Sequence, residues 1–266
     1  MTGAEPDRGG DGVQPAHPIR TNGVSKHFGP VVALRDVTMT LRKGEVLGLI
    51  GDNGAGKSTL IKIITGFHQP DGGTLFIDGE EVRLRSVSHA RSLGIETVYQ
   101  DLALVPGLSV YHNMFLKRER LLRPSPFLSN GAMKRQARAY LQDMGVAIPS
   151  VDAEVARLSG GQRQAIAIAR AVYSDAKILL LDEPLAAMGV KEATLVLDLI
   201  RNLKTKGQVA MIVIAHNYAQ VFEICDRINL LRHGAIFMDR PVAETSIEEL
   251  TDVVVEEYRG SRRPTA

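Results

Sequence analysis

The sequence has little cysteine, no tryptophan and almost no excess of charge of either sign, and these scarcities exclude several classes of protein. The single cysteine, Cys225, can form no intramolecular disulfide and has no CxxC partner for a metal, which is typical of a reducing compartment. The formal net charge is only +2, and the Lys and Arg residues are mostly scattered. We therefore expect no nucleic acid partner.

Long hydrophobic runs are also absent. The longest, residues 209–215 and 178–181, are far shorter than the roughly 20 apolar residues that a membrane helix needs. Residues 1–20 are rich in Gly, Pro, Asp and Arg without the apolar core of a signal peptide, which predicts a disordered tail. Residues 259–266 are interpreted as a second tail, and residues 21–258 as one folded domain. Any membrane association is then expected to come through another protein.

Short apolar runs that alternate with longer helical patterns predict buried parallel strands joined by crossover helices, and hence an α/β fold. These runs are residues 46–50, 177–181, 209–215 and 228–231. Residues 75–84 indicate two strands around the turn Asp78-Gly79, an antiparallel hairpin beside the parallel sheet. Residues 101–163 lack strand patterning, which predicts a helical insert.

Residues 51–58 match the phosphate-loop pattern GxxxxGK[ST], between a buried strand and an amphipathic helix. Glycines let backbone N–H groups surround phosphates, the helix N-terminus adds a partial positive charge, and Lys57 adds a full one. Ser58 is expected to ligate Mg²⁺. An incidental glycine-rich turn is disfavoured because both flanks agree with the pattern. The candidate nucleotide-binding residues are Gly51, Asn53, Gly54, Ala55, Gly56, Lys57, Ser58 and Thr59.

A second acidic motif follows the apolar residues 178–181, which deliver Asp182 and Glu183 to the end of a strand. Ligands of open α/β sheets bind at this position. We expect Asp182 to hold Mg²⁺, usually through water, and Glu183 to polarise the water that attacks the γ-phosphate. The alternative, a solvated acidic turn, is less favoured because the phosphate loop is present in the same chain.

The string Leu158-Ser159-Gly160-Gly161-Gln162 precedes a helical pattern, and Ser159 is well placed to cap that helix. With this string, the chain resembles the ATP-binding subunits of ABC transporters. The resemblance implies a P-loop NTPase (RecA-like) core with an antiparallel β subdomain and a helical subdomain, at about residues 101–163. It also implies that Ser159, Gly160, Gly161 and Gln162 bind the γ-phosphate of an ATP held by a second subunit. A plain N-cap would by itself account for Ser159.

The resemblance implies roles for three further residues. Gln100 matches the glutamine that contacts Mg²⁺ and the attacking water, and His216 matches the histidine that contacts the γ-phosphate. Phe28 matches the aromatic residue that stacks on adenine, where a tyrosine is usual. Gln100 and Phe28 each have a structural alternative, which is a polar strand end for Gln100 and a core side chain for Phe28.

Three segments resemble the ATP-binding subunits of simple-sugar importers of the ribose, xylose and fructose type. They are residues 89–116, 185–192 and 215–217. This branch implies ATP-driven sugar uptake through a separate permease, at the cytoplasmic face of the inner membrane, with an extracytoplasmic sugar-binding protein. One set of motifs predicts a head-to-tail homodimer around two ATP molecules. Residues 102–116 are expected to receive the permease, although about half of them could be helical core instead.

Two departures from many relatives stand close together. Leu185 replaces a Thr or Ser, and Gly189 replaces an Asp of the loop that crosses to the partner subunit. We interpret Gly189 as a marker of the sugar-importer branch, although it leaves intersubunit coupling in question. Three alternatives stay open: the same motor for a nucleoside-like solute, a soluble ABC regulator, and an ATP-binding subunit that no longer hydrolyses.

Overall fold

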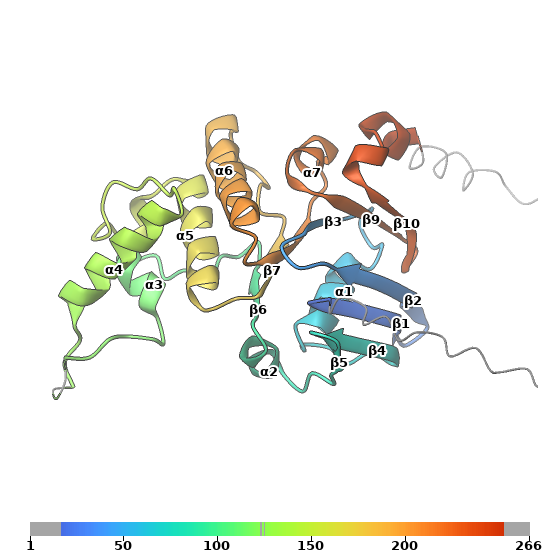
Figure 1. Cartoon of the computed structure of the whole chain (residues 1–266), viewed down its shortest axis with the longest axis horizontal. Coiled ribbons are helices and arrows are strands. Elements are labelled where there is room, and N and C mark those ends of the chain that lie inside the picture. Colours follow the sequence, from blue (N-terminus) through green and yellow to red (C-terminus); the bar gives the residue numbers. More distant parts are fainter. Residues whose placement is uncertain (1–16, 123, 125, 253–266) are drawn as a thin grey trace, which may run out of the picture.

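The computed structural model describes residues 17–122, 124 and 126–252, which form two sheets and their helices (Figure 1). The strands are β1 (Ile19–Phe28), β2 (Val31–Leu41), β3 (Val46–Ile50), β4 (Gly72–Ile77), β5 (Glu80–Glu81), β6 (Ile95–Val98), β7 (Ile178–Asp182), β8 (Ala210–Ile214), β9 (Arg227–Arg232) and β10 (Ala235–Pro241). The helices are α1 (Lys57–Ile64), α2 (Val87–Ser92), α3 (Val110–Phe115), α4 (Asn130–Asp143), α5 (Gly160–Tyr173), α6 (Val190–Lys206) and α7 (Tyr218–Ile224), with short 3₁₀ turns at Val155–Arg157 and Val242–Glu244.

The larger sheet has six strands in the order β10-β9-β3-β8-β7-β6. All neighbouring pairs in it are parallel except β9 and β10, which form an antiparallel edge. The four apolar runs in the sequence become β3, β7, β8 and β9, so the predicted α/β core is confirmed.

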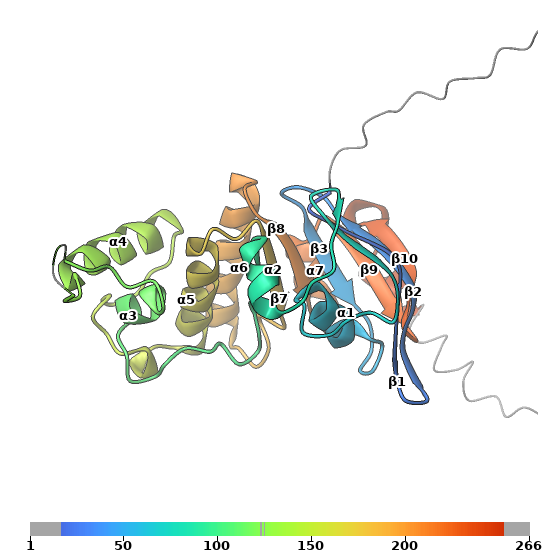
Figure 2. The ribbon, with the colours of Figure 1, turned by 90° about the horizontal axis from the view of Figure 1, so that it is seen from below.

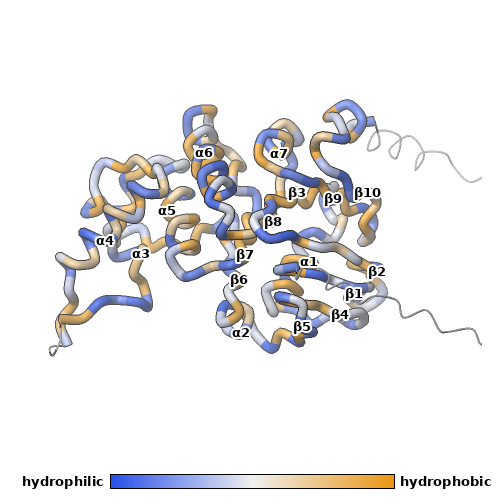
Figure 3. The backbone as a smooth tube through the Cα atoms, in the orientation of Figure 1, coloured by the Kyte–Doolittle hydropathy of each residue, from blue (hydrophilic) through white to orange (hydrophobic). Residues whose placement is uncertain are grey.

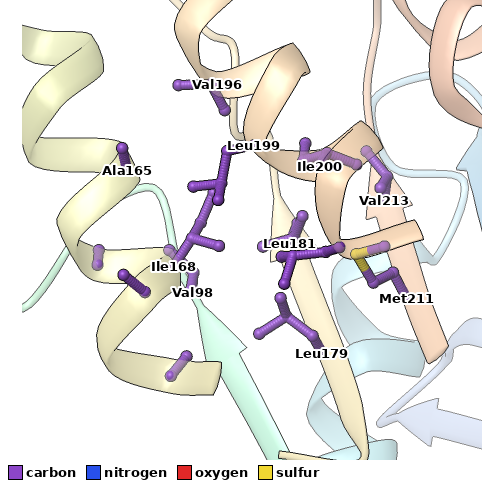
Figure 4. Close-up of a cluster of buried hydrophobic side chains, with 14 of the residues drawn as sticks. Val98, Ala165, Ile168, Leu179, Leu181, Val196, Leu199, Ile200, Met211 and Val213 are labelled. Carbon is purple, nitrogen blue, oxygen red and sulfur yellow. The ribbon is translucent and has the colours of Figure 1, made fainter. Parts of the chain in front are cut away.

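Successive residues of the central strands face opposite sides of this sheet, because side chains alternate along a strand. Ile178 and Leu180 of β7 join one buried cluster, whereas Leu179 and Leu181 join the other. The first cluster packs under α1 and the smaller sheet, and the second packs under α5, α6 and α7. Figure 4 shows part of the second cluster, with Ala165, Ile168, Val196, Leu199 and Ile200 of the helices near Val98, Leu179, Leu181, Met211 and Val213 of the strands.

The smaller sheet is antiparallel, in the order β2-β1-β4-β5. The expected hairpin is present as β4 and β5, and it joins β1 and β2 in this separate sheet, which confirms the antiparallel β subdomain. β1 begins at Ile19, two residues before the expected start of the folded domain, because the buried Ile19 pairs with Leu41 and Ile77. The expected tails otherwise lie in residues 1–16 and 253–266, outside the described residues.

Between β6 and β7 the described chain contains the helices α3, α4 and α5, joined by loops and turns, with two isolated bridges and no strand. Its helices α3 and α4 lie at the end of the molecule opposite the antiparallel sheet, and α5 and α6 lie between them and the parallel strands (Figures 1 and 2). Short hydrophobic and hydrophilic stretches are interspersed along the backbone (Figure 3). No helix among the described residues is long and apolar enough to cross a membrane.

Candidate functional site

The carboxyl ends of four neighbouring parallel strands meet at one edge of the larger sheet. Leu49 of β3 and Asp182 of β7 both pair with Ile214 of β8, and Val98 of β6 pairs with Leu181. The residues that follow these four strands are therefore neighbours, although they are spread from residue 51 to residue 216. This edge brings together the phosphate loop, the acidic pair, His216 and the segment that contains Gln100.

The phosphate loop (residues 51–58) depends on glycine at two close approaches. A Cβ on Gly51, whose φ is 145°, would lie 2.1 Å from the Leu231 carbonyl oxygen, and one on Gly56, whose φ is 108°, would lie 2.6 Å from that of Ala33. Gly56 caps α1 without a side chain. The backbone can thus curl around an anion at a helix N-terminus that offers its own N–H groups.

Lys57 is the buried cation of this loop, with only 6% of its surface exposed. Its Nζ donates hydrogen bonds to the carbonyl oxygens of Gly51 at 2.6 Å and Asp52 at 2.9 Å. Burial lowers the pKa of Lys57, and the carboxylates of Glu183, Asp52 and Asp182 oppose that shift. Neutral carbonyl oxygens accept the hydrogen bonds of the ammonium group across the loop, and phosphate oxygens would form stronger, charge-assisted bonds with it.

The acidic pair sits at the end of β7 in two different environments. Burial raises the pKa of Asp182, the neighbouring Glu183 raises it further, and Lys57 opposes both. Glu183 adopts a left-handed φ of 51°, and its N–H donates to the Ile214 carbonyl oxygen at 3.0 Å. Strained backbone of this kind concentrates at functional sites.

His216 follows β8 and meets Glu183 directly. Its Nε2 lies 2.7 Å from Glu183 Oε1. The next residue, Asn217, caps α7 by accepting a hydrogen bond from the Gln220 N–H, so the chain turns sharply here. The sequence places these two residues in separate motifs, and the structure joins them in one hydrogen-bonded pair.

Gln100 and Phe28 are both exposed. Gln100 lies two residues beyond β6, next to the end of β7. Phe28 is 44% exposed at the turn between β1 and β2, so it is not a core residue, and its ring centroid lies 5.3 Å from that of His68. Sequence reasoning missed His68 and the 62% exposed Phe67, whose positions after α1 match no motif.

The signature loop (residues 158–162) starts α5. The Ser159 hydroxyl accepts from the Gln162 N–H at 3.2 Å, and Gln162 Oε1 accepts from the Ser159 N–H at 3.1 Å, a complete capping box. The Gly160 N–H donates to Glu192 Oε1 at 3.0 Å, a contact that the sequence pattern does not predict.

The signature loop and the phosphate loop are not brought together within one chain. Helix α5 packs on one face of the larger sheet and α1 on the other (Figure 2). The two unusual residues lie after the signature loop, between β7 and α6. Leu185 is buried in the helical cluster, and Gly189 caps α6 with nothing within 4 Å of its Cβ position.

Comparison with known proteins identifies the family. The sequence profile described as ABC transporter matches residues 34–186. The chain belongs to the ABC transporter family. A xylose/arabinose import ATP-binding protein of Sulfolobus acidocaldarius is 51% identical over 231 residues, which cover 87% of this ABC protein and 91% of the relative.

Two further curated relatives and a solved structure agree with this assignment. A fructose import ATP-binding protein of Rhizobium meliloti is 45% identical and covers 82% of this chain and 86% of its own. A ribose import ATP-binding protein of Chromobacterium violaceum is 41% identical, and the match spans 92% of this chain but only 48% of that longer protein. The ADP conformation of an ATP-binding cassette of an ABC transporter superposes with a TM-score of 0.77 at 26% identity, covering 92% of this chain and 99% of its own. This chain is thus an ATPase subunit of the family.

Proposed function

We propose that this ABC ATPase energises the uptake of a simple sugar through a separate membrane permease. Support for the motor comes chiefly from one observation: the 2.7 Å contact between Glu183 and His216 beside an intact phosphate loop. Support for a sugar as the transported solute comes from the sequence identity to relatives named for xylose/arabinose, fructose and ribose import.

In this proposal the phosphate loop holds the β- and γ-phosphates of ATP. The N–H groups at the start of α1 and the Lys57 ammonium would replace the present bonds from Nζ to backbone oxygens with bonds to phosphate oxygens. Asn53, Ala55 and Thr59 would complete the loop. Phe28 would stack on adenine, since its ring is exposed and the strand after its turn approaches Gly56 through Ala33.

Glu183 would act on the water that attacks the γ-phosphorus. Water oxygen bonds to phosphorus, the bond to the β–γ bridging oxygen breaks, and the carboxylate accepts the proton as ADP and phosphate form. His216 Nε2–H would donate to Glu183 Oε1 and fix the direction of the carboxylate. Gln100, at the neighbouring strand end, would orient the water.

The same edge of the sheet has the oxygen donors that Mg²⁺ prefers: the Ser58 hydroxyl, the Asp182 carboxylate and the Gln100 amide. Burial and Glu183 raise the pKa of Asp182, so this carboxylate lacks a full counter-charge, as expected of a cation-binding position. When bound, the ion would neutralise charge on the phosphate oxygens. Asp182 would hold it through water, and Ser58 would hold it directly.

A second copy of the chain would complete each site. The signature loop and the phosphate loop lie at helices that pack on opposite faces of the sheet, which supports a site that is shared between two chains. A head-to-tail pair of chains would place each signature loop against the partner's γ-phosphate. Intact Lys57, Asp182, Glu183 and His216 argue against a subunit that binds ATP without hydrolysing it.

Residues 102–116 would receive the permease. Val105 is 40% exposed and Leu116 is 37% exposed, whereas Val110, Met114 and Phe115 are buried core residues. Arg170 of α5 donates to the carbonyl oxygens of Leu102 and Ala103, which ties the segment to the signature helix. The subunit would then lie at the cytoplasmic face of the membrane, peripheral through the permease, and would not touch the extracytoplasmic sugar-binding protein.

The test is to identify the permease and the binding protein that co-purify with the chain, and to reconstitute the complex in vesicles. We expect one monosaccharide to stimulate ATP hydrolysis when the binding protein is present, and the Glu183→Gln complex to show no stimulation. Stimulation by a nucleoside and by no sugar would overturn the cargo and favour the second candidate. Hydrolysis that is equal in wild-type and Glu183→Gln complexes would overturn the mechanism.

A further inference from the structure

The start of α6 lies unusually close to the start of α5. Glu192 Oε1 accepts a hydrogen bond from the Gly160 N–H at 3.0 Å. A Cβ on Gly161 would lie 2.8 Å from the Glu192 carbonyl oxygen and 2.9 Å from its Cα. Only glycine allows this approach, so the second glycine of the signature loop is needed to seat α6.

The carboxylate of Glu192 is well placed for this contact. It lies in the first turn of α6, and it reaches the first turn of α5, so the positive ends of two helices both favour its charge. The cap of α6, Gly189, contributes no side chain. Glu192 therefore joins the segment that follows Glu183 to the signature loop.

The contact with Glu192 leaves the Ser159 hydroxyl of the signature loop available as a donor. The capping box uses the Ser159 and Gln162 N–H groups, and Glu192 takes that of Gly160. The Ser159 oxygen accepts a bond in the box, so its hydroxyl hydrogen stays available to donate. Glu192 thus contacts the backbone of Gly160, and through it orients the neighbouring donors of the signature loop.

We propose that Glu192 is a positioning residue that holds the signature loop in the orientation that binds the partner's γ-phosphate. The proposal rests on the two-chain site proposed above. Because Glu192 contacts the loop and not the phosphate, its substitution should weaken assembly around ATP without weakening nucleotide binding to the separate chain.

The test uses full-length chain with Glu183→Gln, in which ATP should hold the dimer, and measures the ATP concentration that gives half-maximal dimerisation by light scattering. Glu192→Ala should raise that concentration about tenfold, since it leaves the Gly160 N–H without its acceptor. Glu192→Gln retains an acceptor oxygen and should stay within about threefold of the parent. Lys191→Ala, an exposed neighbour in the same turn, is the control and should change nothing.

Two further measurements separate positioning from folding. The affinity of the monomeric chain for a fluorescent ATP analogue and its melting temperature should be the same with and without Glu192→Ala. Unchanged dimerisation of Glu192→Ala would overturn the proposal, as would tighter dimerisation of both variants, which would mean that the carboxylate only repels the phosphate. Loss of monomer folding or nucleotide binding would also overturn it. If the Glu183→Gln parent fails to dimerise with ATP, the proposed two-chain function fails as well.

Discussion

Helices α1 and α5 both begin at a glycine-containing loop, but their N-termini are prepared for different tasks. Helix α1 has a glycine cap in a left-handed conformation, no side-chain cap and a buried ammonium group across the loop. Helix α5 has a complete capping box, and a carboxylate from α6 accepts its first N–H. The geometry of the phosphate loop suits an anion, whereas the signature loop has satisfied most of its donors within the chain, which agrees with the proposal that it completes a site held by a second chain.

The largest expected effect removes hydrolysis and leaves both loops intact. Glu183→Gln should lower ATP turnover by about 100-fold or more, because it removes the base but keeps an amide oxygen near His216. Chromatography with ATP should then show a stable dimer, which tests whether the two loops meet between chains. A variant that turns ATP over normally, or that stays monomeric at saturating ATP, would contradict this use of the loops.

The next largest expected effect concerns the phosphate loop, which should bind ATP without a second chain. Lys57→Ala should weaken ATP binding to the monomeric chain by about 10- to 100-fold, because it removes the charged donor of the phosphate loop. Equilibrium titration with a fluorescent analogue measures this change. Lys62→Ala, an exposed lysine on the same helix, is the matched control and should bind as the wild type does. Equal affinities for all three proteins would be incompatible with the assignment of residues 51–58.

A third comparison concerns stability without nucleotide. Gly51→Ala should lower the free energy of unfolding by about 2 kcal/mol, because its Cβ would lie 2.1 Å from the Leu231 carbonyl oxygen at a positive φ. Gly160→Ala should change it by less than about 0.5 kcal/mol, since its nearest neighbour would be the Glu192 carboxylate at an ordinary 3.5 Å. Urea unfolding measures both. Equal losses would show that the two loops are packed alike after all.

The smallest effect depends on pH. Burial raises the pKa of Asp182 in the folded chain, so folding favours the protonated form, and stability is lost as pH rises through that pKa. Asp182→Asn should therefore stabilise the nucleotide-free chain by about 1 kcal/mol or less at about pH 8, and by less at about pH 4. Thermal unfolding at both pH values measures the difference. A destabilising effect that grows with pH would mean that Lys57 outweighs burial at this carboxylate.

The parts of the fold that sequence predicts well are those with contiguous apolar runs. The strands β3, β7 and β8 are buried on both faces, so their residues are apolar except Asp182 at the end of β7, and the pattern is plain. The strands β1 and β2 are not evident from the sequence, because their pairing shifts register repeatedly and their ends expose apolar residues such as Val31. Local sequence does not encode such irregular pairing.

The candidate site likewise contains residues that the sequence predicts and contacts that it does not. Lys57, Asp182 and Ser159 are found in short motifs with strand or helix flanks, so their neighbourhoods can be expected from sequence. Glu192 cannot, because its contact exists only when α6 packs against α5. The pairing of Glu183 with His216 likewise depends on the order of β7 and β8 in the sheet.

The alternation of side chains in β7 and β8 has a consequence for mutational studies. Leu179 and Leu180 are adjacent in the chain, yet each belongs to a different buried cluster, and among residues 17–122, 124 and 126–252 no side chain belongs to both clusters. Because the sheet separates the two clusters, truncations of these two leucines should destabilise the protein additively, as mutations at distant sites do. Proximity in the sequence is therefore a poor guide to energetic coupling in this protein, and the face of the sheet is a better one.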